Sequence, residues 1–175
     1  VDYESNNKVP QTSPQARLYS DDDSKNFRIG GKGILLSPLR GGPFWLAVSG
    51  SLGRNLSEHN SKQGYAFGEI TGTWQFNSKL AFSVNPKVAW SGAGNLYGLG
   101  LGANFAISQK LELLPEIIIA GDNFSKTTST IGLRYHFSDS ISTTVYASTA
   151  ASLNNIGQLL GKGDTNAGAM ITIKI

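Results

Sequence analysis

The stretch LYGLGLGANFAI at residues 96–107 divides its side chains between the two sides of an extended chain. Successive residues of a strand point to opposite faces, so this period-two pattern predicts a strand with one apolar face and one face of small or polar groups. Similar alternation runs through most of the sequence after residue 26. We therefore expect an all-β fold. The apolar face of this stretch carries Tyr97, Leu99, Leu101, Ala103, Phe105 and Ile107, and the other face Leu96, Gly98, Gly100, Gly102, Asn104 and Ala106.

The alternation predicts about nine strands, and their lengths suit a membrane. Most span ten residues or more, which exceeds the usual ~5–6 residues of a soluble strand and matches a tilted strand that crosses a bilayer. Residues 1–26 are polar and contain two prolines, so we expect a loop or extension before a barrel domain at 27–175. The segment 152–164 is expected to hold one short helical turn within a loop. The predicted strands are 27–37, 43–54, 64–76, 79–91, 95–107, 110–121, 127–137, 140–150 and 165–175.

Three short turns recur about every 30 residues, the period of a hairpin of two such strands. They are NSK at 77–79, SQK at 108–110 and SDS at 138–140. Aromatic residues before these turns predict an interfacial aromatic band at one rim, and two more around the SGAGN turn predict a band at the other. The residues expected to meet the lipid interface are Trp74, Phe76, Tyr135 and Phe137 at the first rim, and Trp90 and Tyr97 at the second.

The facing pattern favours a barrel with its apolar side chains outside. A water-soluble barrel would have to enclose Trp, Phe, Tyr and Leu from nearly every strand, although a barrel of eight to ten strands has little interior room. The run Gly98, Gly100 and Gly102 fits a crowded interior better than an exposed surface, where glycines would only weaken the strand. The polar face is therefore predicted to line the lumen.

The predicted lumen carries both signs of charge. Two interpretations stay open: a narrow path for solutes, weakly lined by cations, or a salt-bridged plug that conducts nothing. Cross-strand pairing of Lys87 with Glu69, and of Arg134 with Glu112 and Glu116, is expected because unpaired charges in a narrow lumen are costly. The predicted pore-lining residues are Arg28, Lys32, Glu69, Lys87, Glu112, Glu116, Arg134 and Lys174.

Long alternating strands, tight turns after aromatics and longer polar loops resemble those of small Gram-negative outer-membrane β-barrel proteins. The resemblance covers residues 27–175 and includes GLRYHFSDSISTTVYAS and the paired VNPKVAW and LLPEIII segments. It implies an antiparallel up-and-down transmembrane β-barrel of about 8–10 strands in a bacterial outer membrane. Such barrels usually end in an aromatic residue, whereas this sequence ends in Ile175. Pro86 and Pro115 fall within strands and are expected to mark bulges or bends.

Strand parity leaves two arrangements open. If the tight turns face the periplasm, the strand at 27–37 enters from outside, and residues 4–26 form an external loop that follows an earlier strand. The chain is then the C-terminal part of a larger barrel of ten strands or more. Alternatively, 27–37 lies outside the wall and eight strands close from residue 43 to 175.

Several chemistries have no anchor in the sequence. Cysteine is absent, which removes disulfides, thiol nucleophiles and Cys-ligated metals. The net charge is +3 with dispersed basic residues, so no nucleic-acid surface is expected. No apolar run reaches the ~20 residues of a transmembrane helix. Gly98-x-Gly100-x-x-Ala103 lies within an alternating strand with no following helix, so we interpret it as a coincidental match to a dinucleotide fingerprint.

Catalytic and metal-binding candidates are weak, and we expect no enzyme, no cofactor and no metal. His136 and Ser138 share the His-x-Ser spacing of outer-membrane lipid A deacylases, but no acidic residue follows at the matching distance. His59 lies in a polar loop beside Ser57, where a solvated role is more common. The acidic run Asp21–Asp23 lacks the alternate spacing of a calcium loop.

The sequence thus predicts an integral outer-membrane barrel with a passive role. This role is either a narrow pore for small solutes or ions, or a structural or surface-binding barrel in contact with membrane lipid. Two other classes stay open: a membrane-embedded lipid-modifying enzyme, and a soluble β-barrel that binds a lipophilic ligand. The oligomeric state is not set by the sequence.

Overall fold

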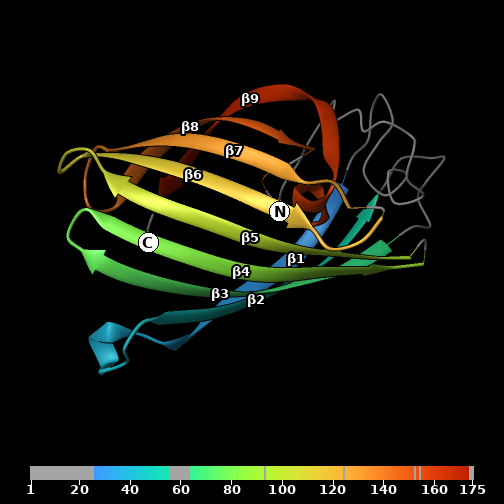
Figure 1. Ribbon diagram of the computed structural model, residues 1–175, viewed down its shortest axis with the longest axis horizontal. Coiled ribbons are helices and arrows are strands. Elements are labelled where there is room, and N and C mark those ends of the chain that lie inside the picture. Colours follow the sequence, from blue (N-terminus) through green and yellow to red (C-terminus); the bar gives the residue numbers. More distant parts are fainter. Residues whose placement is uncertain are drawn as a thin grey trace.

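The computed structural model describes residues 26–55, 64–92, 94–123, 125–151, 153 and 155–173. They form nine antiparallel strands in one curled half-barrel sheet, in which each strand pairs with the next along the chain (Figure 1). The predicted all-β, up-and-down antiparallel architecture is confirmed. The strands are β1 (Asn26–Leu36), β2 (Trp45–Asn55), β3 (Gly64–Asn77), β4 (Leu80–Ser91), β5 (Gly94–Ala106), β6 (Leu111–Ala120), β7 (Thr128–His136), β8 (Ile141–Ala150) and β9 (Gly161–Ile173).

All nine predicted strands are present, most with ends within one or two residues of the prediction. The largest difference is at β9, which begins at Gly161, four residues earlier than expected. Two short 3-10 helices, η2 (Pro38–Arg40) and η3 (Asn155–Leu159), lie between strands. The helical turn predicted within 152–164 corresponds to η3.

The first strand belongs to the wall, so the arrangement in which eight strands close from residue 43 is wrong. β1 pairs with β2 from Asn26↔Asn55 to Leu36↔Leu46. Because every neighbouring pair is antiparallel, β1 and β9 run in the same direction and form the two ends of the sheet. Within the described ranges no ladder joins these two strands, so the closed ring expected from the sequence is not present there. A larger barrel stays a prediction.

The three recurrent turns share one capping scheme. The first polar residue of each turn accepts a backbone hydrogen bond from the residue two positions later: Asn77 Oδ1 from Lys79 N at 2.8 Å, Ser108 Oγ from Lys110 N at 3.3 Å and Ser138 Oγ from Ser140 N at 3.3 Å. Asn and Ser form such local bonds readily, which explains their place at the start of each turn.

The bulges predicted at Pro86 and Pro115 are absent. The β3–β4 register is the same on both sides of Pro86, and the β5–β6 register is the same on both sides of Pro115. Each ladder only omits pairings around its proline, which has no N–H to donate. Pro86 keeps its register partner Leu99 on the other side. The sheet therefore tolerates these prolines by losing a few bonds rather than by inserting a residue.

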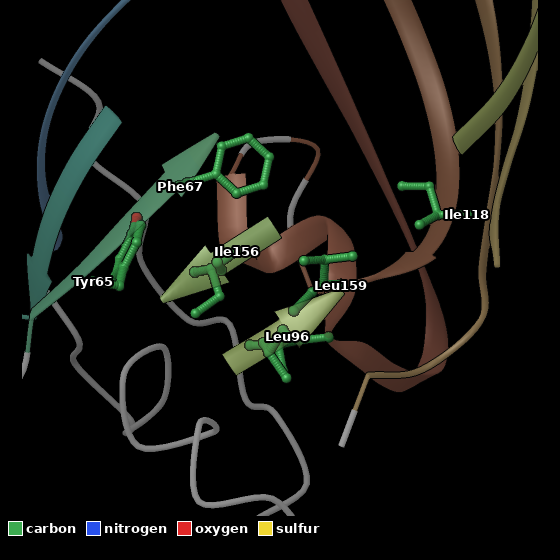
Figure 2. Packing of buried hydrophobic residues seen from close by; sticks show 9 residues of the cluster. Tyr65, Phe67, Leu96, Ile118, Ile156 and Leu159 are labelled. Atoms are coloured by element: carbon green, nitrogen blue, oxygen red, sulfur yellow. The ribbon is translucent and has the colours of Figure 1, made fainter. Parts of the chain in front are cut away.

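A compact apolar cluster lies on the inner face, defined here as the face of the sheet that η3 covers. η3 lies at the end of the strands opposite the tight turns (Figure 1). Figure 2 shows Ile156 and Leu159 of η3 close to Leu96. The full cluster is Tyr65, Phe67, Ala89, Leu96, Ile118, Ala151, Ile156, Leu159 and Leu160.

Candidate functional site: the inner face and its ion pairs

The apolar rows point away from the inner face. Leu99, Leu101 and Phe105 in the middle of the sheet are 40%, 38% and 39% exposed. Charged residues at the predicted lining positions take the opposite side, where they surround two hollows. Outside the apolar cluster beneath η3, this distribution is the reverse of what a soluble barrel with a lipophilic ligand in its cavity needs.

The predicted aromatic bands occupy the outer face near both ends of the strands. Near the tight turns, the rings of Tyr135 and Phe137 meet edge to face with centroids 5.0 Å apart, and Phe76 meets Phe82 at 5.3 Å. Trp74, on the same side, has its ring centroid 5.1 Å from that of Phe44. At the other end, Trp90 and Tyr97 are both exposed.

Lys87 is the centre of the first ionic cluster. Its Nζ lies 3.6 Å from Glu69 Oε2 and 3.5 Å from Glu116 Oε1, and its side chain is only 1% exposed. Ser49 Oγ donates to Glu69 at 3.1 Å, and Asn85 Nδ2 donates to Glu116 at 3.3 Å. A buried cation with two carboxylates, each further hydrogen-bonded, meets the condition under which buried charge is tolerated. The predicted Lys87–Glu69 pair is confirmed, and Glu116 joins it.

Glu112 is the centre of the second ionic cluster, nearer the tight turns. Its Oε2 lies 3.4 Å from Arg134 Nη1 and 3.4 Å from His136 Nε2, and it accepts a hydrogen bond from Asn104 Nδ2 at 3.3 Å. Arg134 also donates through Nε to Thr144 Oγ1 at 3.2 Å. The predicted Arg134–Glu112 pair is confirmed. The expected Arg134–Glu116 pair is wrong. The β6–β7 register places Glu116 opposite Thr130, and its carboxylate pairs with Lys87 instead.

Arg28 and Lys32 lie on the edge strand β1, beside the first cluster. Both line a hollow of about 450 Å³ together with Glu69. Lys32 also lines a second hollow of about 530 Å³, shared with Glu116 and Arg134. The two hollows adjoin each other, and Gln158 lines both. Lys174, the last predicted lining residue, lies outside the described residues.

Gln158 and its neighbours form an inner segment that the sequence interpretation missed. We define the inner segment as η3 together with Leu160. Ile156 and Leu159 are completely buried, and Lys87 donates a hydrogen bond from Nζ to Gln158 Oε1. Two signals in the sequence could have indicated it. Ile156, Leu159 and Leu160 have helical spacing within a polar loop, and Leu96 is a large apolar residue on an otherwise small and polar face.

The inward glycines make room for this crowded interior, as predicted. A Cβ on Gly98 would lie 2.4 Å from Leu159 Cδ2, and one on Gly100 would lie 1.8 Å from Asn85 Oδ1. A Cβ on Gly102 would lie 2.8 Å from Ser83 Oγ. All three distances are shorter than van der Waals contact, so a side chain at any of these β5 positions would have to displace its neighbour.

The two residues of the His-x-Ser candidate, His136 and Ser138, have different partners in the structure. Ser138 Oγ accepts backbone hydrogen bonds from Ser140 and Ile141 at 3.3 and 3.2 Å, which gives it a role in the turn. The imidazole of His136 lies beside the carboxylate of Glu112, and His136 is opposite Ser142 in the β7–β8 register. His59 and Asp21–Asp23 lie outside the described residues.

Within the described ranges, no three His, Asp or Glu side chains gather in a way that could hold a metal ion. In the same part of the chain, no helix has the length and apolar character needed to cross a membrane. Comparison with protein-family models, curated proteins and solved structures finds no match for this chain.

Proposed function

We propose that this chain forms the wall of an integral outer-membrane β-barrel with a passive role. The observation that carries the proposal is the outward apolar face, which extends from Ile29 on β1 to Ile171 on β9. A soluble protein rarely exposes an apolar surface that is continuous over more than a few hundred Å². Contact of this face with lipid chains costs no hydrophobic free energy, whereas its exposure to water is unfavourable.

Two further features support a bilayer. The strands are 9 to 14 residues long, which suits a tilted membrane-crossing strand of ~9–11 residues with rims on both sides. Exposed aromatic residues lie near both ends of the strands and leave an aliphatic band between them, as interfacial girdles do. Membrane lipid is therefore the proposed partner of the outer face.

For the inner face we propose a narrow path for small solutes or ions rather than a wide channel. Both ionic clusters pair their charges across strands, which favours a small polar interior over a broad aqueous one. The role is not enzymatic in this proposal. The hydroxyl of Ser138 is used by its turn, and Glu112 Oε2 is shared by Arg134, His136 and Asn104.

A charge placed on the outer face tests the proposal. In detergent-refolded protein mixed with vesicles, Leu101→Arg is expected to reduce insertion strongly, because Arg near the bilayer midplane costs about 2–4 kcal/mol. Leu39→Arg, at an exposed residue of η2 outside the wall, is the matched control and is expected to insert normally. Heat-modifiable gel migration and resistance to added protease report insertion.

The two classes of protein give opposite results in this experiment. In a water-soluble barrel, Leu101→Arg would be harmless or would raise solubility, and the wild-type chain would remain monomeric in buffer without detergent. That outcome would remove the membrane assignment and the transport role with it.

A further inference from the structure

The inner segment fills one end of a polar interior with apolar side chains. Ile156, Leu159 and Leu160 are at most 2% exposed, although they belong to a connection between strands. All three belong to the same buried cluster as Leu96 on β5 and Tyr65 on β3. Ile156 and Leu159 lie close to Leu96 (Figure 2). The segment therefore blocks the inner face where it lies, at the end opposite the tight turns (Figure 1).

The segment is attached to the wall by a few discrete bonds rather than by a ladder. Lys126 N donates to Leu159 O at 3.0 Å, and Thr128 Oγ1 donates to Gln158 O at 2.9 Å. At its base, β8 and β9 pair at Ala150↔Gly161. Ala151 N also donates to Leu160 O at 2.6 Å, next to that pairing. The bonds of residues 156–159 to the wall belong to no strand pairing, so this part of the segment can leave the inner face without breaking the sheet.

Gln158, like Lys32, lies where the two hollows adjoin. It is common to the hollow of about 450 Å³ beside β1 and the hollow of about 530 Å³ beside β6 and β7. Its side chain accepts a hydrogen bond from Lys87, the buried cation between Glu69 and Glu116. Withdrawal of Gln158 would join the two hollows along the charged part of the inner face.

We infer that the inner segment is the gate of the lumen, and that the Lys87–Gln158 hydrogen bond is its latch. The inference rests on the proposed membrane function, because a gate has meaning only in a barrel that spans a bilayer. With the segment in place the path is closed between the two hollows. With the segment withdrawn, a solute passes along Lys87 and its two carboxylates.

The first test is planar-bilayer recording of Gln158→Ala beside the wild-type chain. Loss of a hydrogen bond to a charged group, about 1.5–3 kcal/mol, corresponds to a rise of about tenfold or more in the fraction of time spent open. Gln109→Ala is the matched control, because Gln109 lies in an exposed turn at the opposite end. It is expected to behave as wild type.

The second test locks the segment in place. The chain contains no cysteine, so Gly98→Cys with Leu159→Cys introduces the only thiols, at positions that contact each other across the inner face. If the oxidised double variant is silent and addition of dithiothreitol restores openings, the gate is supported. Leu159→Cys alone, in which Gly98 is kept, serves as the control for the effect of dithiothreitol.

The outcomes separate the gate from the membrane assignment. If the wild-type chain and Gln158→Ala insert with heat-modifiable migration but show the same conductance or the same silence, the gate is wrong and the membrane proposal stands. Conductance of the oxidised cysteine pair equal to that of the reduced pair leads to the same conclusion. If no variant inserts, both proposals fall.

Discussion

A methyl group placed on Gly98 would lie 2.4 Å from Leu159 Cδ2 and 3.1 Å from Ile118 Cγ2. The missing side chain at this β5 position therefore makes the space in which the inner segment sits. Leu159 is completely buried within the apolar cluster. The same glycine also approaches the carbonyl oxygen of Ile119 on β6, at 3.3 Å from the ideal Cβ.

Gly98→Ala is expected to lower the free energy of unfolding by about 1–3 kcal/mol, the usual cost of overpacking a filled site. Gly31→Ala is the matched control, because a Cβ there meets nothing within 4 Å. Urea unfolding in detergent micelles measures both. Equal effects of the two substitutions would contradict the close contact between Gly98 and Leu159.

Substitutions at Gly100 and Asn85 are expected to have coupled effects on stability. A Cβ on Gly100 would lie 1.8 Å from Asn85 Oδ1, so Gly100→Ala is expected to destabilise the wild-type chain by about 1–3 kcal/mol. In an Asn85→Ala background the obstruction is gone, and the same substitution should cost little. A double-mutant cycle on unfolding free energies measures the coupling. Additive effects would show that the two residues do not meet as described.

The ionic cluster at Lys87 predicts an asymmetry between removing one charge and removing all three. Lys87→Met leaves Glu69 and Glu116 close together without their cation, and is expected to cost about 3–5 kcal/mol. Lys79→Met, in an exposed turn, is the control and is expected to be close to neutral.

Addition of Glu69→Gln and Glu116→Gln to Lys87→Met should recover much of the lost stability, since no uncompensated charge then remains. Thermal or urea unfolding of the three variants in one detergent compares them directly. If the triple variant were less stable than Lys87→Met, the cluster would owe its stability to something other than charge compensation.

Much of this arrangement could be predicted from the sequence, because alternation of apolar and polar residues over ten residues or more is a strong signal for a strand. The outward direction of Leu99 and Leu101 follows from alternation, and alternation with strand order places Lys87 and Glu69 on the same face of neighbouring strands. Their direct pairing depends on the β3–β4 register. The inner segment could not be placed in the same way. Its burial depends on Leu96 and Phe67, which lie far apart in the sequence and meet Ile156 only once the sheet has curled.

Local backbone chemistry explains the other misses. The sequence predicts a bulge or bend at Pro86, but the ladder contains no bulge there, because an omitted ladder bond suffices where the proline nitrogen faces one neighbour only. The sequence predicts two carboxylate partners for Arg134, both on the neighbouring strand at 110–121. Strand register gives it Glu112, its direct partner, and places Glu116 opposite Thr130 instead. Both outcomes depend on single-residue register, which alternation does not define.

The aromatic bands yield the final prediction. Trp74 and Trp90 lie near opposite ends of the strands on the outer face, so in a bilayer both should sit at interfacial depth. In single-tryptophan variants with the other tryptophans replaced by Phe, shallow brominated lipids are expected to quench both residues more than deeply brominated lipids do. Aqueous iodide should quench them weakly. Strong iodide quenching of both, with no response to either lipid, would mean that the bands face water, and the outer face would then need a protein partner rather than lipid to cover it.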